Sequence, residues 1–478
     1  MALSGAEIWA IAYLSVEWAI RIAMIVVVPL RRAPEASRSW LLLVFFLPIP
    51  ALLIYLLIGR PTYPRWRRDR FSRLPGVLAA ASREIRHSRF CRRPDLPDNL
   101  MGPAVLIEKL GQFPALAGNN LELICEYDLM IDRLVADIDQ ARQSVHLLFY
   151  ILSDDETGLK AVAALDRAAR RGVKCRVLID AIGSRRAARR LSTRLAPAGV
   201  EVQLALKVGI FRRRSARADL RNHRKIAVID SEIGYVGSQN ITNAEFRPGV
   251  TNEELVARVV GPVTTELQAV FIADWFMETD EELDTPTLFP HHPPDAGVVA
   301  QVLPSGPDYP DAGIGHLVVA LIHGARERIV ITTPYFVPDE ALLQALKIAA
   351  LRGVEVHLVL SAITDQLLVS LAQRSYYTEL LIAGIRIHLY KDRFLHAKHM
   401  SFDREIAVVG SSNLDIRSFV LNAEISLIAF DRGVTGMLER EQGRYIRSST
   451  DLTIELWQGR PIFARIGENL ARLAGPLL

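Results

Sequence analysis

Two stretches of this sequence share one pattern: His-x-Lys-x4-Asp, then six residues, then Gly-Ser-x-Asn. The first copy consists of His223, Lys225, Asp230, Gly237, Ser238 and Asn240. The second copy consists of His396, Lys398, Asp403, Gly410, Ser411 and Asn413. Six identities in register, twice in one chain, indicate a duplicated functional unit.

The residue types in this pattern suit the transfer of a phosphoryl group. A neutral imidazole can attack phosphorus to form a phosphohistidine, and a second, protonated imidazole can donate its proton to the leaving oxygen. Lys225, Lys398, Asn240 and Asn413 can bind the non-bridging oxygens as charge builds in the transition state. No cluster of acidic metal ligands adjoins the motifs, so we expect neither a metal nor a cofactor.

Strand periodicity separates the roles within each motif. Residues two apart on a strand face the same side, so each histidine should point the same way as its lysine. Asp230 and Asp403 belong to the catalytic motif, but they lie an odd five residues past the lysine. We therefore expect both aspartates to face away and to act structurally. We expect Ser238 and Ser411 to support the histidines and the turn.

The elements that position the motifs are also duplicated. The first copy has an expected strand, helix and strand over residues 144–152, 155–171 and 173–180. The second copy has the same elements over residues 328–336, 339–352 and 354–361. This alternation predicts an α/β fold with right-handed βαβ crossovers and a largely parallel sheet.

Two apolar runs precede these units, over residues 8–30 and 40–58. Each has the length that a bilayer requires of a helix, and we favour two transmembrane helices. Glu17 and Arg21, four residues apart in the first run, can pair on one helix face. Pro48 and Pro50 interrupt the second run, so a re-entrant hairpin is the alternative.

Arginine is concentrated after the apolar runs. Residues 60–93 hold eleven arginines against Asp69 and Glu84, which predicts a cytoplasmic flank lying on anionic headgroups. A basic insert before the first motif, residues 207–222, supplies three candidate headgroup-binding residues, Arg212, Arg213 and Arg214. A solvated loop is the alternative for this insert. The three cysteines are far apart and predict neither a disulfide framework nor a zinc site.

The two motifs resemble the HKD motifs of the phospholipase D superfamily. The segments "GSSNLDIRSFVLNAEISL" (410–427) and "FFLPIPALLIYLLIGR" (45–60), with the paired apolar runs, are similar to bacterial cardiolipin synthases of the membrane-anchored type. The resemblance covers essentially the whole chain. It implies two PLD-like domains related by a pseudo-twofold axis, with both histidines at the interface.

The resemblance also implies roles for the site residues. His223 would be the nucleophile and His396 the general acid and then base, although the symmetry leaves the reverse assignment open. Glu424 stands where the superfamily keeps a carboxylate that orients the histidine of the second copy. The counterpart in the first copy is Glu253 or Glu254, and we favour Glu254.

The chain is thus expected to contain four segments. These are a membrane hairpin (1–60), a basic juxtamembrane linker (61–120), a first PLD-like domain (121–300) and a second PLD-like domain (301–478). We expect a multi-pass protein of the bacterial inner membrane, with the catalytic domains on the cytoplasmic face.

The expected reaction joins two phosphatidylglycerol molecules into cardiolipin and glycerol through a phosphohistidine. The expected partners are phosphatidylglycerol and anionic membrane lipids, not nucleic acid, and the sequence sets no oligomeric state. The alternatives are a membrane-bound phospholipase D or other phosphatidyltransferase, a nuclease of the same superfamily, and a catalytically silent membrane scaffold. An apolar N-terminal hairpin disfavours the nuclease, and two intact motifs disfavour the scaffold.

Overall fold

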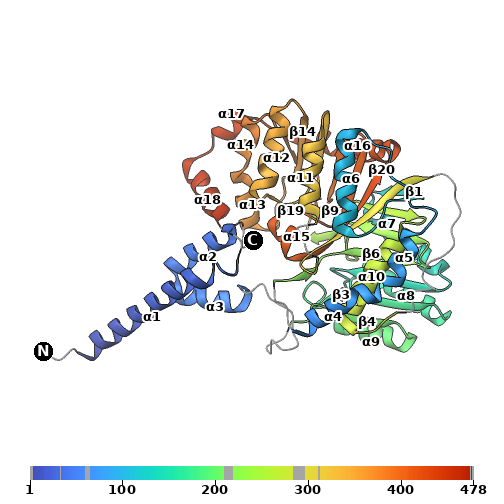
Figure 1. Cartoon of the computed structure of the whole chain (residues 1–478), viewed down its shortest axis with the longest axis horizontal. Helices are drawn as coiled ribbons and strands as arrows, with labels where there is room; N and C mark the ends of the chain where they lie inside the picture. The colour runs from blue at the N-terminus through green and yellow to red at the C-terminus, as the bar shows by residue number, and fades with distance from the viewer. Residues whose placement is uncertain are drawn as a thin grey trace.

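The computed structural model describes residues 4–32, 34–59, 65–208, 219–283, 297–309, 313–473 and 475. Helices of the N-terminal segment project from a large α/β body, and the C-terminal end of the chain lies beside them (Figure 1). The two repeated units form the two halves of the body.

Helix α1 (Gly5–Val27) begins at a capping box in which the Ser4 side chain accepts from the backbone of Glu7 and the Glu7 side chain accepts from that of Ser4. Among the described residues it is the one helix long and apolar enough to cross a membrane. Glu17 and Arg21 form the predicted ion pair at 3.2 Å. The guanidinium of Arg21 also donates to the Phe45 carbonyl, which ties α1 to the next helix.

The second apolar run forms two short helices, α2 (Pro34–Phe46) and α3 (Pro48–Ile58). The chain turns at Leu47, because a proline is favoured at the start of a helix but breaks its interior. Trp40 packs edge-on against Tyr55 with ring centroids 5.1 Å apart, so the two helices fold back on each other. The second apolar run therefore forms two short helices in place of the one continuous helix expected over 40–58, and the chain turns where Pro48 and Pro50 were expected to interrupt it.

Part of the arginine-rich tract binds the protein itself. Helix α4 (Arg65–Val77) packs on α10 (Thr264–Thr279). The buried guanidinium of Arg67 pairs with Glu278 at 2.6 Å and with Asp308 at 2.7 Å, and Arg73 pairs with Asp280. The expectation that this tract lies on headgroups is therefore corrected for α4. Helices α5 (Ala79–Arg86) and α6 (Asp98–Gly111) continue along the body.

In the first half, the strands of the large sheet that the structure describes follow the order β1-β10-β7-β6-β2-β3-β4. Their bounds are β1 (Leu116–Ile124), β2 (Ser144–Phe149), β3 (Lys174–Asp180), β4 (Glu201–Ala205), β6 (Lys225–Ile229), β7 (Ile233–Gly237) and β10 (Val256–Val260). Strands β2, β3 and β4 are parallel, as predicted. The motif strand β6 runs antiparallel to β2, and β6, β7, β10 and β1 pair antiparallel in turn, so the expectation of a largely parallel sheet is wrong. Helices α7 (Tyr127–Gln140), α8 (Glu156–Arg170) and α9 (Ala188–Leu195) belong to this half.

The second half repeats this plan in the order β21-β15-β14-β12-β17-β18-β20-β11. Its strands are β11 (Val298–Ser305), β12 (Arg328–Thr332), β14 (Glu355–Ser361), β15 (Arg386–Tyr390), β17 (His399–Phe402), β18 (Ile406–Gly410), β20 (Asn422–Phe430) and β21 (Ser449–Leu452). Its helices include α11 (Ile314–Gly324), α12 (Glu340–Leu351), α13 (Leu367–Ser375), α14 (Tyr377–Ile382), α16 (Arg432–Arg447), α17 (Ile454–Gln458) and α18 (Ile462–Leu473). Helices α8 and α12 start at equivalent caps, where Asp155 and Asp339 each accept a backbone N–H.

The two halves form one continuous body. Strand β1 pairs antiparallel with β11, with Leu116 opposite Ala300. A shared apolar core between the halves includes Val236 of the first and Val409 of the second. Each half also has a hydrophobic core of its own beneath its outer helices. This packing holds the two motif regions against each other.

Candidate active site

The two motif histidines line one cavity. This cavity has a volume of about 370 Å³, and its walls include His223, His396, Asn240 and Asn413. Residues 173 positions apart in the sequence thus reach a single space between the halves. The shared cavity is what the duplicated pattern predicts for two groups acting on one phosphorus.

Short strands exchanged between the halves place the histidines. Strand β5 (Arg221–Asn222) pairs with β20 of the second half, and the His223 N–H donates to the Ala423 carbonyl at 2.9 Å. In the same way β16 (Phe394–Leu395) pairs with β9 (Val250–Glu253) of the first half, and the His396 N–H donates to the Glu253 carbonyl at 2.8 Å. Each histidine is therefore anchored to the opposite half.

The supporting carboxylates follow from this exchange. Glu424 comes directly after Ala423, and its Oε1 lies 3.1 Å from Nδ1 of His223. Glu254 comes directly after Glu253, and its Oε1 lies 2.7 Å from Nδ1 of His396. The expectation that each carboxylate orients the histidine of its own copy is wrong, because the pairs cross between the halves.

The choice between Glu253 and Glu254 also has a structural answer. Glu254 faces a histidine, whereas the carboxylate of Glu253 pairs with Arg444 and with Arg393.

The motif serines occupy supporting positions. Ser411 donates its hydroxyl to the Glu424 carboxylate, and the Ser238 hydroxyl accepts the Leu255 N–H at 3.0 Å.

The two lysines turn back onto the histidine backbone. Nζ of Lys225 donates to the His223 carbonyl at 2.6 Å, and Nζ of Lys398 donates to the His396 carbonyl at 2.5 Å. Burial lowers the pKa of Lys225 to about 7 and that of Lys398 to about 8, although the buried glutamates oppose this shift. Both lysines therefore titrate close to neutral pH.

Burial also keeps the histidines neutral in the free protein. It lowers the pKa of His223 to about 4 and lowers that of His396 as well. Burial alone would raise the pKa of Glu254 and Glu424, but the facing histidine of each prevails and their pKa values fall. With Nδ1 of each ring facing a carboxylate, Nε2 of each ring is the nitrogen left to contact a ligand.

The motif aspartates act at a distance from the cavity. The Asp230 carboxylate accepts the backbone N–H groups of residues 142, 143 and 144, at 2.8, 2.7 and 2.8 Å. Asp403 makes the equivalent three contacts to residues 326, 327 and 328. Both aspartates have positive φ angles, 51° and 49°. They fix the start of β2 and of β12, which fits the structural role expected of both aspartates and not a catalytic one.

The asparagines lie in the cavity wall with different partners. The Asn240 Oδ1 accepts the Ile151 N–H at 3.1 Å. Within the described part of the chain, the buried Oδ1 of Asn413 has no hydrogen-bond partner. Because an amide can be flipped, Asn413 can present either its oxygen or its NH2 group to a ligand. Such an unsatisfied buried polar atom is typical of a binding site.

Sequence reasoning missed several cavity residues. The Tyr150 ring lies 4.8 Å from the His223 ring, and Tyr335, Asp415 and Arg417 also line the cavity. Tyr150 could have been found, because it lies within the predicted strand 144–152, which pairs with the motif strand. The others carry no spacing signal.

The basic insert is only partly described. The candidates Arg212, Arg213 and Arg214 lie outside the described residues. Arg221 of the same insert lines the cavity and pairs with Asp180 at 3.3 Å.

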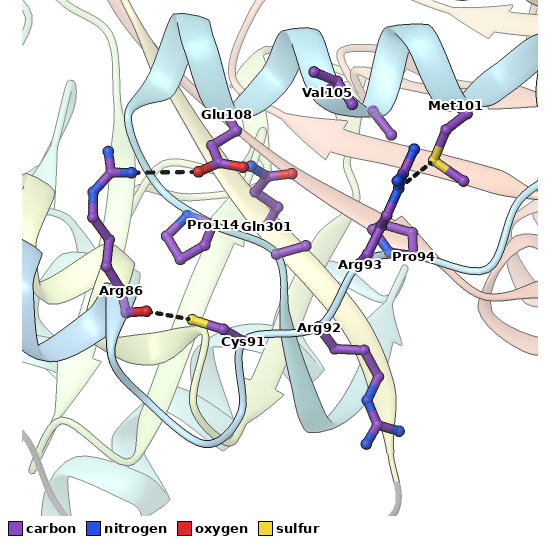
Figure 2. Close-up of a pocket in the computed structure, with 12 residues that line it drawn as sticks. Arg86, Cys91, Arg92, Arg93, Pro94, Met101, Val105, Glu108, Pro114 and Gln301 are labelled. Atoms are coloured by element: carbon purple, nitrogen blue, oxygen red, sulfur yellow. Dashed lines mark hydrogen bonds and ion pairs between the residues drawn. The ribbon is translucent and has the colours of Figure 1, made fainter.

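A second cavity, of about 520 Å³, lies between α6 and the start of β1 (Figure 2). None of the motif residues lines it. Arg86 pairs with Glu108 at 3.3 Å, Nε of Arg93 lies 3.3 Å from the Met101 sulfur, and the Arg92 side chain points away. The chemistry of the motifs therefore belongs to the first cavity.

Comparison with known proteins agrees with this geometry. A family model described as "Cardiolipin synthase, PLD-like domain" matches residues 134–275 and 318–445. Cardiolipin synthase A of Pectobacterium carotovorum is 37% identical over 462 residues, covering 94% of each chain. Cardiolipin synthase A of Yersinia pseudotuberculosis is 35% identical over 465 residues, again covering 94% of each.

A solved structure shares the fold. The crystal structure of phosphatidylserine synthase from Haemophilus influenzae matches with a TM-score of 0.62 and 14% identity, over 79% of this chain and 100% of that one. Together with the two family-model segments, this likeness confirms the predicted duplicated PLD-like fold. The chain belongs to the cardiolipin synthase family of the phospholipase D superfamily.

Proposed function

We propose that the protein transfers a phosphatidyl group from one phosphatidylglycerol molecule to another, giving cardiolipin and glycerol. Nε2 of His223 attacks the donor phosphorus, and the bond from phosphorus to the glycerol oxygen breaks as His396 donates a proton to that oxygen. The terminal hydroxyl of the second phosphatidylglycerol then gives its proton to His396 and attacks the phosphohistidine. The phosphorus–nitrogen bond breaks and His223 is regenerated.

One observation carries this proposal: two imidazoles, each 14% exposed, share a cavity, and each has a carboxylate at Nδ1. A phosphodiester must be attacked on one side while an alkoxide is protonated on the other. Two oriented histidines supply both functions. The exchange of one phosphodiester for another needs no nucleotide or other energy source.

Glu254 lies closer to its histidine, at 2.7 Å, than Glu424 lies to His223, at 3.1 Å, and this difference supports the order of roles. Burial lowers the pKa of His223 to about 4, so this ring is neutral and nucleophilic. The pKa of His396 is also lowered, with Glu254 at 2.7 Å opposing the effect of burial. A bound phosphodiester adds a negative charge that raises both pKa values. His396 then holds the proton needed for the leaving glycerol.

The membrane segment supports lipid acceptors over water. Water is the more concentrated nucleophile, so a transferase gains from a high local concentration of lipid acceptor and from a closed site. Helix α1 and the α2–α3 hairpin hold the body at a bilayer. We place the body on the cytoplasmic side of the bacterial inner membrane, because arginines 31, 32, 38 and 65–93 flank these helices.

Reconstitution with labelled phosphatidylglycerol tests the reaction. The wild-type protein in vesicles should form cardiolipin and glycerol in equal amounts, and His223→Ala and His396→Ala should each lose about 10² to 10⁴ in rate with the natural leaving group. Release of phosphatidic acid alone by the wild type would overturn the proposal in favour of hydrolysis.

A further inference from the structure

The C-terminal helix α18 presents an apolar stripe to the outside of the protein. Its exposed large side chains are Ile462, Phe463, Ile466, Leu470 and Leu473. At 100° per residue these five positions fall within about a quarter of the helix circumference. Phe463 is 82% exposed, although a surface helix normally turns such a stripe inward.

The opposite face of α18 is polar and faces the protein. Glu468 is 2% exposed and pairs with Arg460 at 2.5 Å and with Arg374 of α13 at 3.3 Å. Arg472 pairs with Glu379 of α14 at 2.8 Å. This orientation is the reverse of that of an ordinary surface helix in water. Ion pairs hold the polar face of α18 against the protein, and its apolar face is exposed.

The stripe lies between the membrane helices and the catalytic cavity. The Ser39 hydroxyl of α2 donates to the Leu473 carbonyl at 3.0 Å, and Figure 1 shows the C-terminal end of α18 beside α2. Gly475, two residues beyond α18, lines the cavity that holds both histidines. Helix α13 packs on α18, exposes Leu367 and Leu368, and contributes Val369 to the cavity.

We propose that α18 is an interfacial helix that lies in the surface of an anionic bilayer and seats the mouth of the catalytic cavity on the lipid. Its apolar stripe enters the boundary between headgroups and acyl chains, as in helices with one apolar and one charged face. The exposed Arg465, on the flank of the stripe, reaches the anionic headgroups. A lipid can then pass from the bilayer to His223 and His396 without crossing water.

A bilayer suits this face better than a second copy of the chain. The C-terminal end of α18 contacts α2 through Ser39, and α2 packs on α1, the described helix long and apolar enough to span a membrane. The anchor therefore brings the stripe to lipid in every molecule, whatever the protein concentration.

Photocrosslinking of the full-length protein tests the contact directly. Phe463 and, separately, Leu470 are replaced by p-benzoyl-phenylalanine, and the protein is irradiated in phosphatidylglycerol vesicles with labelled acyl chains. Leu351, 74% exposed at the end of α12, is the matched control. Lipid adducts at positions 463 and 470 but not at 351 support the proposal. Protein dimers at 463 and 470, or no adducts there, overturn it.

A kinetic comparison tests the link to the cavity and rests on the proposed function. The pair Phe463→Ser and Leu470→Ser should raise KM for vesicle phosphatidylglycerol about tenfold, because two apolar side chains no longer enter lipid. The kcat, and the activity on a monomeric short-chain phosphatidylglycerol, should stay as in the wild type. Leu351→Ser should change neither. An unchanged KM on vesicles would overturn the seating role, whereas failure of the wild type to make cardiolipin would overturn the proposed function and leave the lipid adducts intact.

Discussion

Glutamine at position 424 or at position 254 should impair different halves of the reaction. Glu424→Gln removes the charge facing the proposed nucleophile His223, and Glu254→Gln removes the charge facing the proposed acid His396. The amide keeps the size of the side chain in both variants. The two effects can be separated with a donor lipid that carries p-nitrophenol in place of glycerol, because this leaving group departs without protonation.

The size of the effect follows from the distances. Two unit charges 3.1 Å apart interact by about 5 kcal/mol at an effective dielectric constant of about 20. With about half of the positive charge formed on His223 in the transition state, Glu424→Gln loses about 2.7 kcal/mol, or about 100-fold in rate at about 1.36 kcal/mol per factor of ten. Loss of the preferred tautomer can only add to this.

Release of p-nitrophenol in a rapid-mixing experiment reports formation of the phosphohistidine. Glu424→Gln should slow this release about 100-fold. Glu254→Gln should leave it within a few-fold of the wild type, yet should slow glycerol release from natural phosphatidylglycerol about 100-fold. Thermal unfolding controls for folding of both variants.

The opposite pattern would refute either the crossed pairing or the assignment of His223 as nucleophile. If Glu254→Gln slowed p-nitrophenol release while Glu424→Gln did not, either each carboxylate would serve the histidine of its own half or the two histidines would have exchanged roles. His223→Ala distinguishes these outcomes, because only loss of the nucleophile abolishes p-nitrophenol release.

Three further predictions concern charge and stability. The value of kcat/KM should fall as the pH rises through about 7 to 8, because the buried Lys225 and Lys398 lose the protons with which we propose that they bind phosphate; a flat pH profile would contradict this proposed role. Asp230→Ala should lower the free energy of unfolding by about 2 kcal/mol, because three backbone N–H groups lose their acceptor; equilibrium unfolding measures this, and a loss of activity at unchanged stability would argue for direct catalysis. Arg67→Ala should cost about 3 kcal/mol and release α4 from α10, because two acidic partners are left unpaired; faster proteolysis at α4 is the expected result, and unchanged cleavage would show that packing alone holds the helix.

Most of the fold was accessible from local patterns. The alternation of strand and helix around residues 144–180 and 328–361 predicted both βαβ units, and the repeated motif predicted the duplication. The antiparallel direction of the motif strands was missed, because the direction of a strand depends on its neighbour in the sheet and leaves no mark in its own sequence. The turn at Leu47 was visible only as an alternative, since Pro48 permits either a kink or a new helix.

For the candidate active site, too, the sequence determined one part and the tertiary structure decided the other. The spacing of His223, Lys225 and Asp230 indicates which groups can do chemistry, because the same residue types recur in register at His396, Lys398 and Asp403. The sequence also determines the apolar anchor. Only the tertiary structure decided that Glu424 serves His223 and Glu254 serves His396, because short strands exchanged between the halves bring together residues that no local pattern connects. It also decided that α18 turns its apolar stripe outward, since the ion pairs that set its orientation come from other helices.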